Sequence, residues 1–275
     1  MREIRYHIFD PTGNITVLVE SPVPVEAQPA VAAALLRAEP AAEQAGFLSA
    51  AEGCGLALRM AGGEFCGNAA MSAAAFYALR NGVTAGPIRV RVSGAPAPVA
   101  VRLESLDDCS VPPRMGGDGT VSAGGWRGTV EMPRPLSVGR ENLPGGASPV
   151  VVRLPGIAHV ILTQTVSREE AESAVRDWCA ALGADALGLM LLGADHEELG
   201  LTPLVYVPAG DTLYWERSCA SGSAAVGAYL AAEAGKPVTA ALREPGGTLT
   251  VSAAPDGAVS LTGTVKYLKE GAIEL

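Results

Sequence analysis

Two cysteines stand in similar surroundings, each in a run of small residues that leads into an alanine-rich segment. The segment after Cys66 ends at Asn81 and Gly82, and the one after Cys219 ends at Gly235. A glycine just past such a segment is typical of a helix end, so each cysteine is predicted to begin a helix. The first helical turn carries unpaired N–H groups and the positive end of the dipole, which lower a thiol pKa and bind a carboxylate.

This pair of thiols has the chemistry that inversion of an α-carbon requires. One thiolate removes the α-proton from one face, and the opposing thiol delivers a proton to the other face. Cys66 and Cys219 lie about half the chain length apart, which predicts two similar halves that each contribute one thiol. A single cysteine is more typical of a buried structural residue, and we assign that role to Cys54, Cys109 and Cys179. A disulfide between Cys66 and Cys219 would be an oxidised, inactive state.

The remaining sequence predicts a mixture of strands and helices in both halves. Helices are expected over 29–38 and from a Ser167 cap to Leu182. Strands are expected on both sides of a turn at 10–14 and at the following ranges: 15–19, 57–60, 88–92, 99–103, 150–154, 159–163, 201–207 and 248–252.

A Gly- and Ser-rich stretch at 112–128 favours flexible turns over core and predicts a domain boundary. The expected domains are 1–120 and 121–263. The alternative is one continuous α/β domain with a loop-rich insertion.

The composition favours a protein that acts on a small molecule over one that binds nucleic acid or spans a membrane. The 275 residues carry a net charge of −9, with no basic patch of the kind that binds nucleic acid. No apolar run approaches the length of a membrane-spanning helix. The first residues lack the apolar core of a signal peptide, so a reducing, cytoplasmic location is expected.

The cysteine motifs resemble those of the diaminopimelate epimerase and proline racemase superfamily. Residues 66–68 (Cys-Gly-Asn) are similar to the first motif of the epimerases. Residues 216–219 (Glu-Arg-Ser-Cys) with 221–223 (Ser-Gly-Ser) are more similar to the second motif of the proline racemases. The further Gly-x-Gly-Glu-Thr that diaminopimelate epimerases usually carry between Glu-Arg and the cysteine is missing here.

A closer resemblance is to the histidine racemases that supply D-histidine for opine-type metallophores. Arg217 and Ala220 stand where Asn and Gly are expected in that group, which leaves room for a substrate with a different side chain. The resemblance rests on these segments: 11–14, 43–47, 63–69, 203–208, 215–216 and 245–247.

The resemblance implies an α+β fold of two pseudo-symmetric domains. Each domain would be a curved mixed sheet wrapped round a central helix, with the active site in the interdomain cleft, and a C-terminal strand, 264–275, would return to the first domain. Cys66 and Cys219 would be the catalytic acid and base. The substrate-binding residues would be Asn14, Gly67, Asn68, His159, Glu216, Arg217, Ser221, Gly222 and Ser223.

Some of these residues have structural alternatives. His159 fits a hydrogen-bonded histidine at a strand end as well as a site residue. For Glu43 and Glu64 we favour a structural or capping role.

The sequence predicts an isomerase without a cofactor. Pyridoxal phosphate would need a Schiff-base lysine, and Lys236, Lys266 and Lys269 lie near a helix end or the C-terminus. The scattered histidines make no metal cluster, and no nucleotide loop is present.

The leading hypothesis is a histidine racemase with an amino-acid substrate and no nucleic-acid or membrane partner; a homodimer is compatible with it. The alternatives are a diaminopimelate epimerase or another amino-acid racemase, and a non-catalytic amino-acid-binding or thiol-sensing protein.

Overall fold

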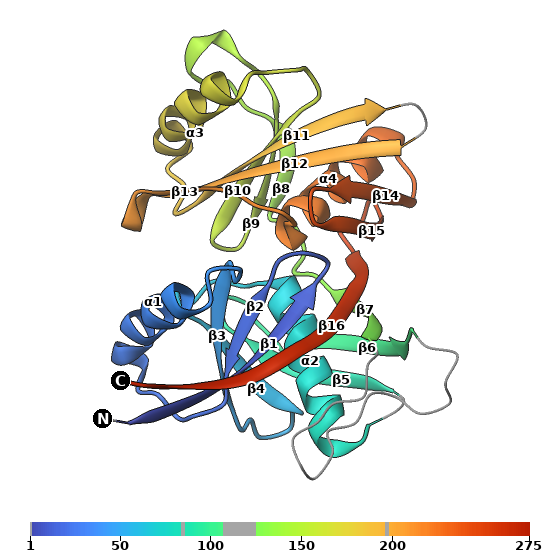
Figure 1. The fold of residues 1–275 in the computed structure, drawn as a ribbon. Coiled ribbons are helices and arrows are strands. Elements are labelled where there is room, and N and C mark those ends of the chain that lie inside the picture. The colour runs from blue at the N-terminus through green and yellow to red at the C-terminus, as the bar shows by residue number, and fades with distance from the viewer. Residues whose placement is uncertain (1, 84–85, 107–124, 196–197) are drawn as a thin grey trace. The chain divides into compact units, whose positions relative to one another are not determined.

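The computed structural model describes residues 2–83, 86–106, 125–195 and 198–275, which form an α+β fold (Figure 1). The chain divides into two compact units, Met1–Glu131 with Thr262–Leu275, and Met132–Leu261. The domain boundary expected near residue 120 lies outside the described residues. The first compact unit ends at Glu131, and the C-terminal segment belongs to this unit.

The first unit is a closed sheet around a helix. Its strands pair in the order β1-β2-β3-β4-β5-β6-β7-β16, and β16 pairs again with β1, so no edge strand remains in this ring. The elements are β1 (Glu3–Pro11), β2 (Thr16–Val19), a 3-10 turn (Val25–Ala27), α1 (Gln28–Ala38), β3 (Gln44–Ser49), β4 (Leu56–Met60), α2 (Gly67–Asn81), β5 (Pro87–Val92), β6 (Val99–Ser105), β7 (Gly125–Glu131) and β16 (Val259–Glu274).

Helix α2 lies inside this ring and contacts β1, β2, β4, β5, β6 and β7. Its alanines are small enough for strands to surround it, and a helix that is apolar on every side is stable only when buried. The run Ala73–Ala75 has no exposed surface. The helix ends where Gly82 adopts the left-handed conformation, with φ 64°.

The second unit has a sheet in the order β15-β14-β12-β11-β10-β9-β8, with β13 paired to β12. Helix α4 packs on β8, β9, β10, β11, β14 and β15, and α3 packs on β11 and β12. The elements are β8 (Ser137–Arg140), a 3-10 turn (Pro144–Gly146), β9 (Val150–Leu154), β10 (Ile157–Leu162), α3 (Arg168–Leu182), β11 (Leu187–Asp195), β12 (Glu198–Val207), a 3-10 turn (Pro208–Gly210), β13 (Thr212–Trp215), α4 (Ala220–Ala234), β14 (Val238–Glu244) and β15 (Gly247–Ala253).

The two units repeat one connectivity. In the first, the pairs β1–β2, β3–β4 and β5–β6 are antiparallel, and crossings through α1 and α2 join them by the parallel pairs β2–β3 and β4–β5. In the second, β9–β10, β11–β12 and β14–β15 are antiparallel, and crossings through α3 and α4 produce the parallel pairs β10–β11 and β12–β14. Helices α2 and α4 therefore occupy equivalent places, and each has 15 residues.

The structure contradicts one expectation of the sequence analysis and adds strands that the analysis did not predict. The stretch from Gly125 to Gly128 is not a flexible turn but the start of β7, where Trp126 is buried. A side chain at Gly128 would stand 3.1 Å from Met71 Sδ, so this glycine allows strand and helix to approach closely. Five further strands have no counterpart among the expected ones: β3, β8, β11, β13 and β14. For β11 the reason is that its apolar run lacks the alternation that marks a half-buried strand.

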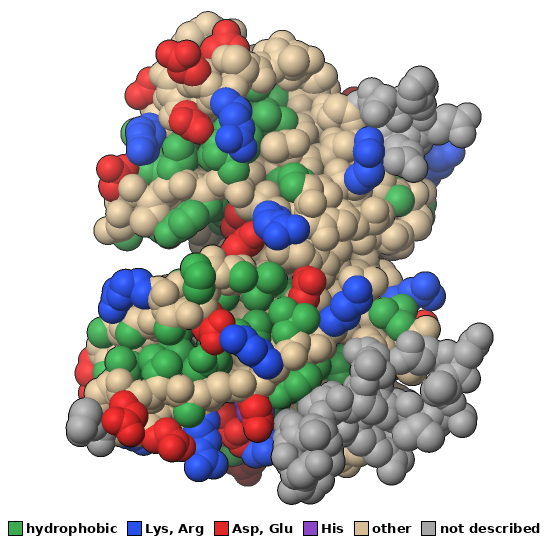
Figure 2. Space-filling model, in the orientation of Figure 1, with side chains coloured by type: hydrophobic (Ala, Val, Ile, Leu, Met, Phe, Trp, Pro, Cys, Tyr) green, Lys and Arg blue, Asp and Glu red, His purple; other side chains and the backbone are tan. Residues whose placement is uncertain are grey.

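On the face drawn in Figure 2, acidic and basic side chains are interspersed among neutral ones. Within the described part of the chain, no helix is long and apolar enough to cross a membrane.

Candidate active site

Cys66 is the cap residue of α2. Its backbone is extended, with φ −134° and ψ 115°, and its sulfur accepts the N–H of Ala69 at 3.4 Å. A cap side chain of this kind satisfies one of the N–H groups that a helix start leaves unpaired. Gly67 and Asn68 follow in the same turn and are buried. The first predicted motif therefore lies at a helix start, as the sequence indicates.

A network of polar side chains joins Cys66 to Asn14. The Cys66 thiol donates to Gln44 Oε1 at 3.2 Å, and Gln44 Nε2 donates to Asn14 Oδ1 at 2.5 Å. Asn14 Nδ2 donates in turn to Glu43 Oε2 at 2.7 Å. Asn14 is buried, so the network fixes its amide orientation. The structure thus brings together Asn14 and Cys66, two residues that the sequence analysis selected from separate segments.

Cys219 is the cap residue of α4 and has the same local geometry as Cys66. Its φ is −127° and its ψ 99°, and its sulfur accepts the N–H of Gly222 at 3.4 Å. The hydroxyl of Ser221 lies 3.6 Å from the sulfur. Ser223 is fully buried, and its N–H donates to Cys219 O at 2.8 Å. The second predicted motif therefore also lies at a helix start.

Two carboxyl groups surround Cys219. Glu216 forms a side-chain hydrogen bond with the thiol, and Glu244 Oε2 accepts the backbone N–H of Cys219 at 2.6 Å. Burial raises the pKa of the Cys219 thiol well above its usual value, and the charges of Glu216 and Glu244 raise it further. The expected lowering of this pKa by the helix start is therefore wrong for Cys219. Desolvation outweighs the dipole, and the group rests as a thiol.

Met190 fills the space against the first turn of α4. A side chain at Gly222 would collide with Met190 Sδ and would stand 3.2 Å from Cys219 Sγ. A side chain at Gly188 would likewise collide with the ring of His159 and would stand 3.0 Å from Met190 Cε. Met190 therefore connects the surroundings of His159 with those of Cys219.

His159 lies on β10 and is completely buried. Among the described residues, neither of its ring nitrogens has a hydrogen-bond partner. Burial lowers the pKa of His159 to about 3, so the ring is neutral at physiological pH. The structure thus gives it neither of the hydrogen bonds that the alternative strand-end role would use, and its contact with substrate stays a prediction.

The remaining cysteines and Arg217 lie apart from these contacts. Arg217 is exposed, and its carbonyl accepts the N–H of Gly246 at 2.7 Å. Cys179 is buried, and its thiol donates to the carbonyl of Ala184 at 3.3 Å, as expected of a structural cysteine. Cys54 is half-buried, and Cys109 lies outside the described residues.

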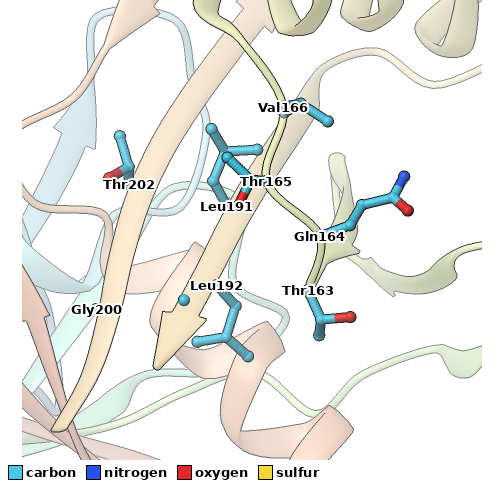
Figure 3. Close-up of a pocket in the computed structure, with 9 residues that line it drawn as sticks. Thr163, Gln164, Thr165, Val166, Leu191, Leu192, Gly200 and Thr202 are labelled. Atoms are coloured by element: carbon cyan, nitrogen blue, oxygen red, sulfur yellow. The ribbon is translucent and has the colours of Figure 1, made fainter. Parts of the chain in front are cut away.

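A pocket of about 280 Å³ opens elsewhere on the second unit (Figure 3). It lies between the segment after β10 and the strands β11 and β12. Its lining is uncharged and contains none of the predicted site residues: Thr163, Gln164, Thr165, Val166, Leu191, Leu192, Gly193, Gly200 and Thr202.

Three residues next to the cysteines were not selected from the sequence: Gln44, Met190 and Glu244. Gln44 and Glu244 lie inside or beside segments that carry the family resemblance, 43–47 and 245–247. Their position in or next to these segments is the sequence signal that could have identified them as site residues. Nothing in the local pattern around Met190 marks it. Among the described residues, no group of three or more His, Cys, Asp and Glu side chains could hold a metal ion.

Comparison with known proteins identifies the family. Residues 3–273 match the family described as "Histidine racemase CntK N-terminal domain", a match that includes both cysteine motifs. The chain belongs to this family. As a member of a racemase family, the chain is an isomerase.

Individual relatives agree with this assignment. The chain is 28% identical to a histidine racemase of Staphylococcus aureus over 90% of its own length and 88% of that protein. It is 27% identical to a histidine racemase of Fusobacterium nucleatum over 81% of its length and 79% of that protein. Among solved structures, a hydroxyproline epimerase from Agrobacterium vitis has the same fold, with a TM-score of 0.66 and 13% identity, covering 100% of this chain and 93% of that one.

Proposed function

We propose that this chain interconverts L- and D-histidine without a cofactor, by a two-thiol mechanism that uses Cys66 and Cys219. The observation that carries the proposal is the equivalence of the two cysteines. Each caps a central helix of 15 residues, and each sulfur accepts the N–H of the residue three positions later. Equivalent positions in two repeated units are what two opposed proton-transfer groups require.

The backbone of the two helix starts suits an amino-acid carboxylate. The N–H groups beside each cysteine point out of the first turn, where the dipole favours an anion. We propose that the two helix starts face one substrate across an interdomain cleft. The α-carboxylate would be held by the turns at 67–68 and 221–223. Asn14, Glu216, Arg217 and His159 would contact the rest of the substrate.

The proton balance is then simple. One cysteine, as thiolate, takes the α-proton and becomes a thiol, while the substrate becomes a carbanion whose charge delocalises onto the carboxylate oxygens held by the helix-start N–H groups. The opposite thiol gives its proton to the other face of that carbon and becomes a thiolate. In the reverse direction the roles exchange. The raised pKa of Cys219 means that this residue starts as the proton donor.

Solvent exchange tests the reaction. The reduced protein is incubated with L-histidine in deuterated water, and loss of the α-proton and formation of D-histidine are followed by NMR and chiral chromatography. We expect both with the wild type, and losses of at least about 100-fold with Cys66→Ser and with Cys219→Ser, because general acid–base groups contribute about 10²–10⁴-fold. Cys54→Ser is the matched control and should retain wild-type activity. Full racemisation by either active-site variant would exclude the two-thiol mechanism.

A panel of other L-amino acids, with diaminopimelate and proline among them, tests the substrate. Exchange with another amino acid but not histidine would keep the reaction class and replace the substrate. Absence of exchange with every compound would favour the non-catalytic alternative.

A further inference from the structure

Glu244 is a buried carboxyl group that meets Cys219 from outside its helix. It is the last residue of β14 and is 5% exposed. Oε2 accepts the N–H of Cys219 at 2.6 Å, and Oε1 accepts the hydroxyl hydrogen of Ser223. One carboxyl group therefore holds both ends of the first turn of α4.

The turn after Glu244 is tied to the same segment. The N–H of Gly246 donates to Arg217 O at 2.7 Å, so the chain on both sides of Pro245 contacts the residues at the helix start. The β14–β15 turn and the Cys219 motif thus form one connected structure. A shift of this turn would move the backbone of Cys219.

Two N–H donors of the helix start have acceptors within the chain. Glu244 takes the N–H of Cys219, and the sulfur takes that of Gly222. The backbone of Ser221 lies between these two donors and belongs to the turn 221–223 that is proposed to hold the substrate carboxylate. Glu244 therefore contacts the motif without using the N–H of Ser221.

We propose that Glu244 is a positioning residue for proton transfer at Cys219: its carboxyl group fixes the backbone of the helix start so that the sulfur faces the substrate. This inference rests on the proposed racemase function. Cys66 is held differently, through the neutral amide of Gln44, so Glu244 belongs to one half of the site alone.

The charge of Glu244 depends on pH. Its pKa is raised to about 8, because burial and, to a smaller extent, the charge of Glu216 outweigh the lowering effect of the hydrogen bonds from Ser223, Cys219 and Ser218. The titratable groups that act on Glu244 are Glu216 and Cys219. The helical segment 220–227 and strand β15 carry none. At neutral pH the group is a carboxylic acid, and a glutamine is its uncharged counterpart, with one oxygen for the Cys219 N–H and an amide N–H₂ beside the Ser223 hydroxyl.

Two variants of the full chain test the proposal. Glu244→Gln keeps an acceptor for the Cys219 N–H, and its amide N–H₂ can donate to the Ser223 hydroxyl, which reverses the direction of that hydrogen bond, so we expect kcat at pH 7 within about threefold of wild type. Glu244→Ala removes both contacts, and we expect kcat to fall at least about tenfold, with KM within about threefold, since a misplacement of about 1 Å can cost about 100-fold. Glu141→Ala, which removes another half-buried carboxyl group of the same unit, is the control and should leave both constants unchanged.

A second measurement does not depend on turnover or on the alanine variant. The rate of alkylation of Cys219 by iodoacetamide is followed against pH by peptide mass spectrometry. Because the charge of Glu244 raises the pKa of this thiol, Glu244→Gln should shift the alkylation midpoint to lower pH, and Glu141→Gln should not.

The outcomes separate the two proposals. A wild-type protein without α-proton exchange would refute the proposed function. If the wild type is active, three results would refute the role of Glu244. Glu244→Ala could be as active as the wild type, Glu244→Gln could be as slow as the alanine variant, or the alkylation profile could stay unchanged in Glu244→Gln.

Discussion

The sulfurs of Cys66 and Cys219 share one backbone geometry but meet different neighbours. Cys66 donates to the neutral amide of Gln44, whereas Cys219 is enclosed by the carboxyl groups of Glu216 and Glu244. A thiolate is costly beside buried carboxyl groups, so Cys219 retains its proton at rest. A reaction in which the two thiols take opposite roles gains from such a difference, because Cys219 then holds its proton before substrate arrives.

The buried carboxyl of Glu244 also predicts how stability depends on pH. Its pKa is about 8 in the folded chain, against 4.5 as the ordinary value. Between these values the folded state binds a proton that the unfolded state has lost, so stability falls as pH rises from about 5 to 8. The maximum effect is about 1.4 kcal/mol for each unit of pKa difference.

Urea unfolding of wild type and Glu244→Gln from pH 5 to 9 measures this effect. The unfolding free energy of the wild type minus that of Glu244→Gln should fall steadily up to about pH 8 and then level off. His159, whose pKa is about 3, gives the opposite slope below about pH 6.5, but it is present in both proteins and cancels. A difference that stays flat or favours the wild type at higher pH would contradict the buried, protonated state.

At the scale of elements, the helices were the most predictable part of the molecule. The alanine-rich runs with glycine stops gave α2 and α4, and Ser167 with Glu170 forms the capping box that begins α3. These signals are local. The misses depend on packing between distant segments: Gly128 is explained only by Met71, and the contact of Glu244 with Cys219 joins two segments that no local pattern connects.

The fit between α4 and its sheet predicts an effect on stability. A side chain at Gly227 would collide with Val251 on β15, and Val251 is branched at Cβ and fully buried. Gly227→Ala is therefore expected to lower the unfolding free energy by about 1–3 kcal/mol, although alanine favours helices. Chemical denaturation measures the loss. Gly139→Ala on β8, where nothing lies within 4 Å of the new carbon, is the control.

A double variant shows whether the collision is the cause. Val251→Ala alone should destabilise by creating a cavity, and Gly227→Ala should then cost less in its presence than in the wild type. Strict additivity of the two losses would argue against direct contact as the reason.

At the scale of the whole molecule, the C-terminal strand pairs with the N-terminal strand. The C-terminal strand β16 pairs with β1 from Pro11 with Val265 to Glu3 with Glu274, and this pairing closes the sheet of the first unit. Helix α2, which Cys66 caps, lies inside that closed sheet. One half of the proposed site therefore depends on the last residues of the chain, although they are far from Cys66 in sequence.

Removal of the segment Thr262–Leu275 tests this dependence. Truncation after Leu261 should leave β1 and β7 as open edges, since both pair with β16. Hydrogen exchange followed by mass spectrometry should then show lost protection of the amides in β1, β7 and α2. The amides of β9 and β10, whose partners lie within Met132–Leu261, should stay protected. Truncation after Ile273 removes only the end of the pairing and should affect the start of β1 alone. Full protection of β1 and α2 in the longer truncation would show that the ring does not need its closing strand.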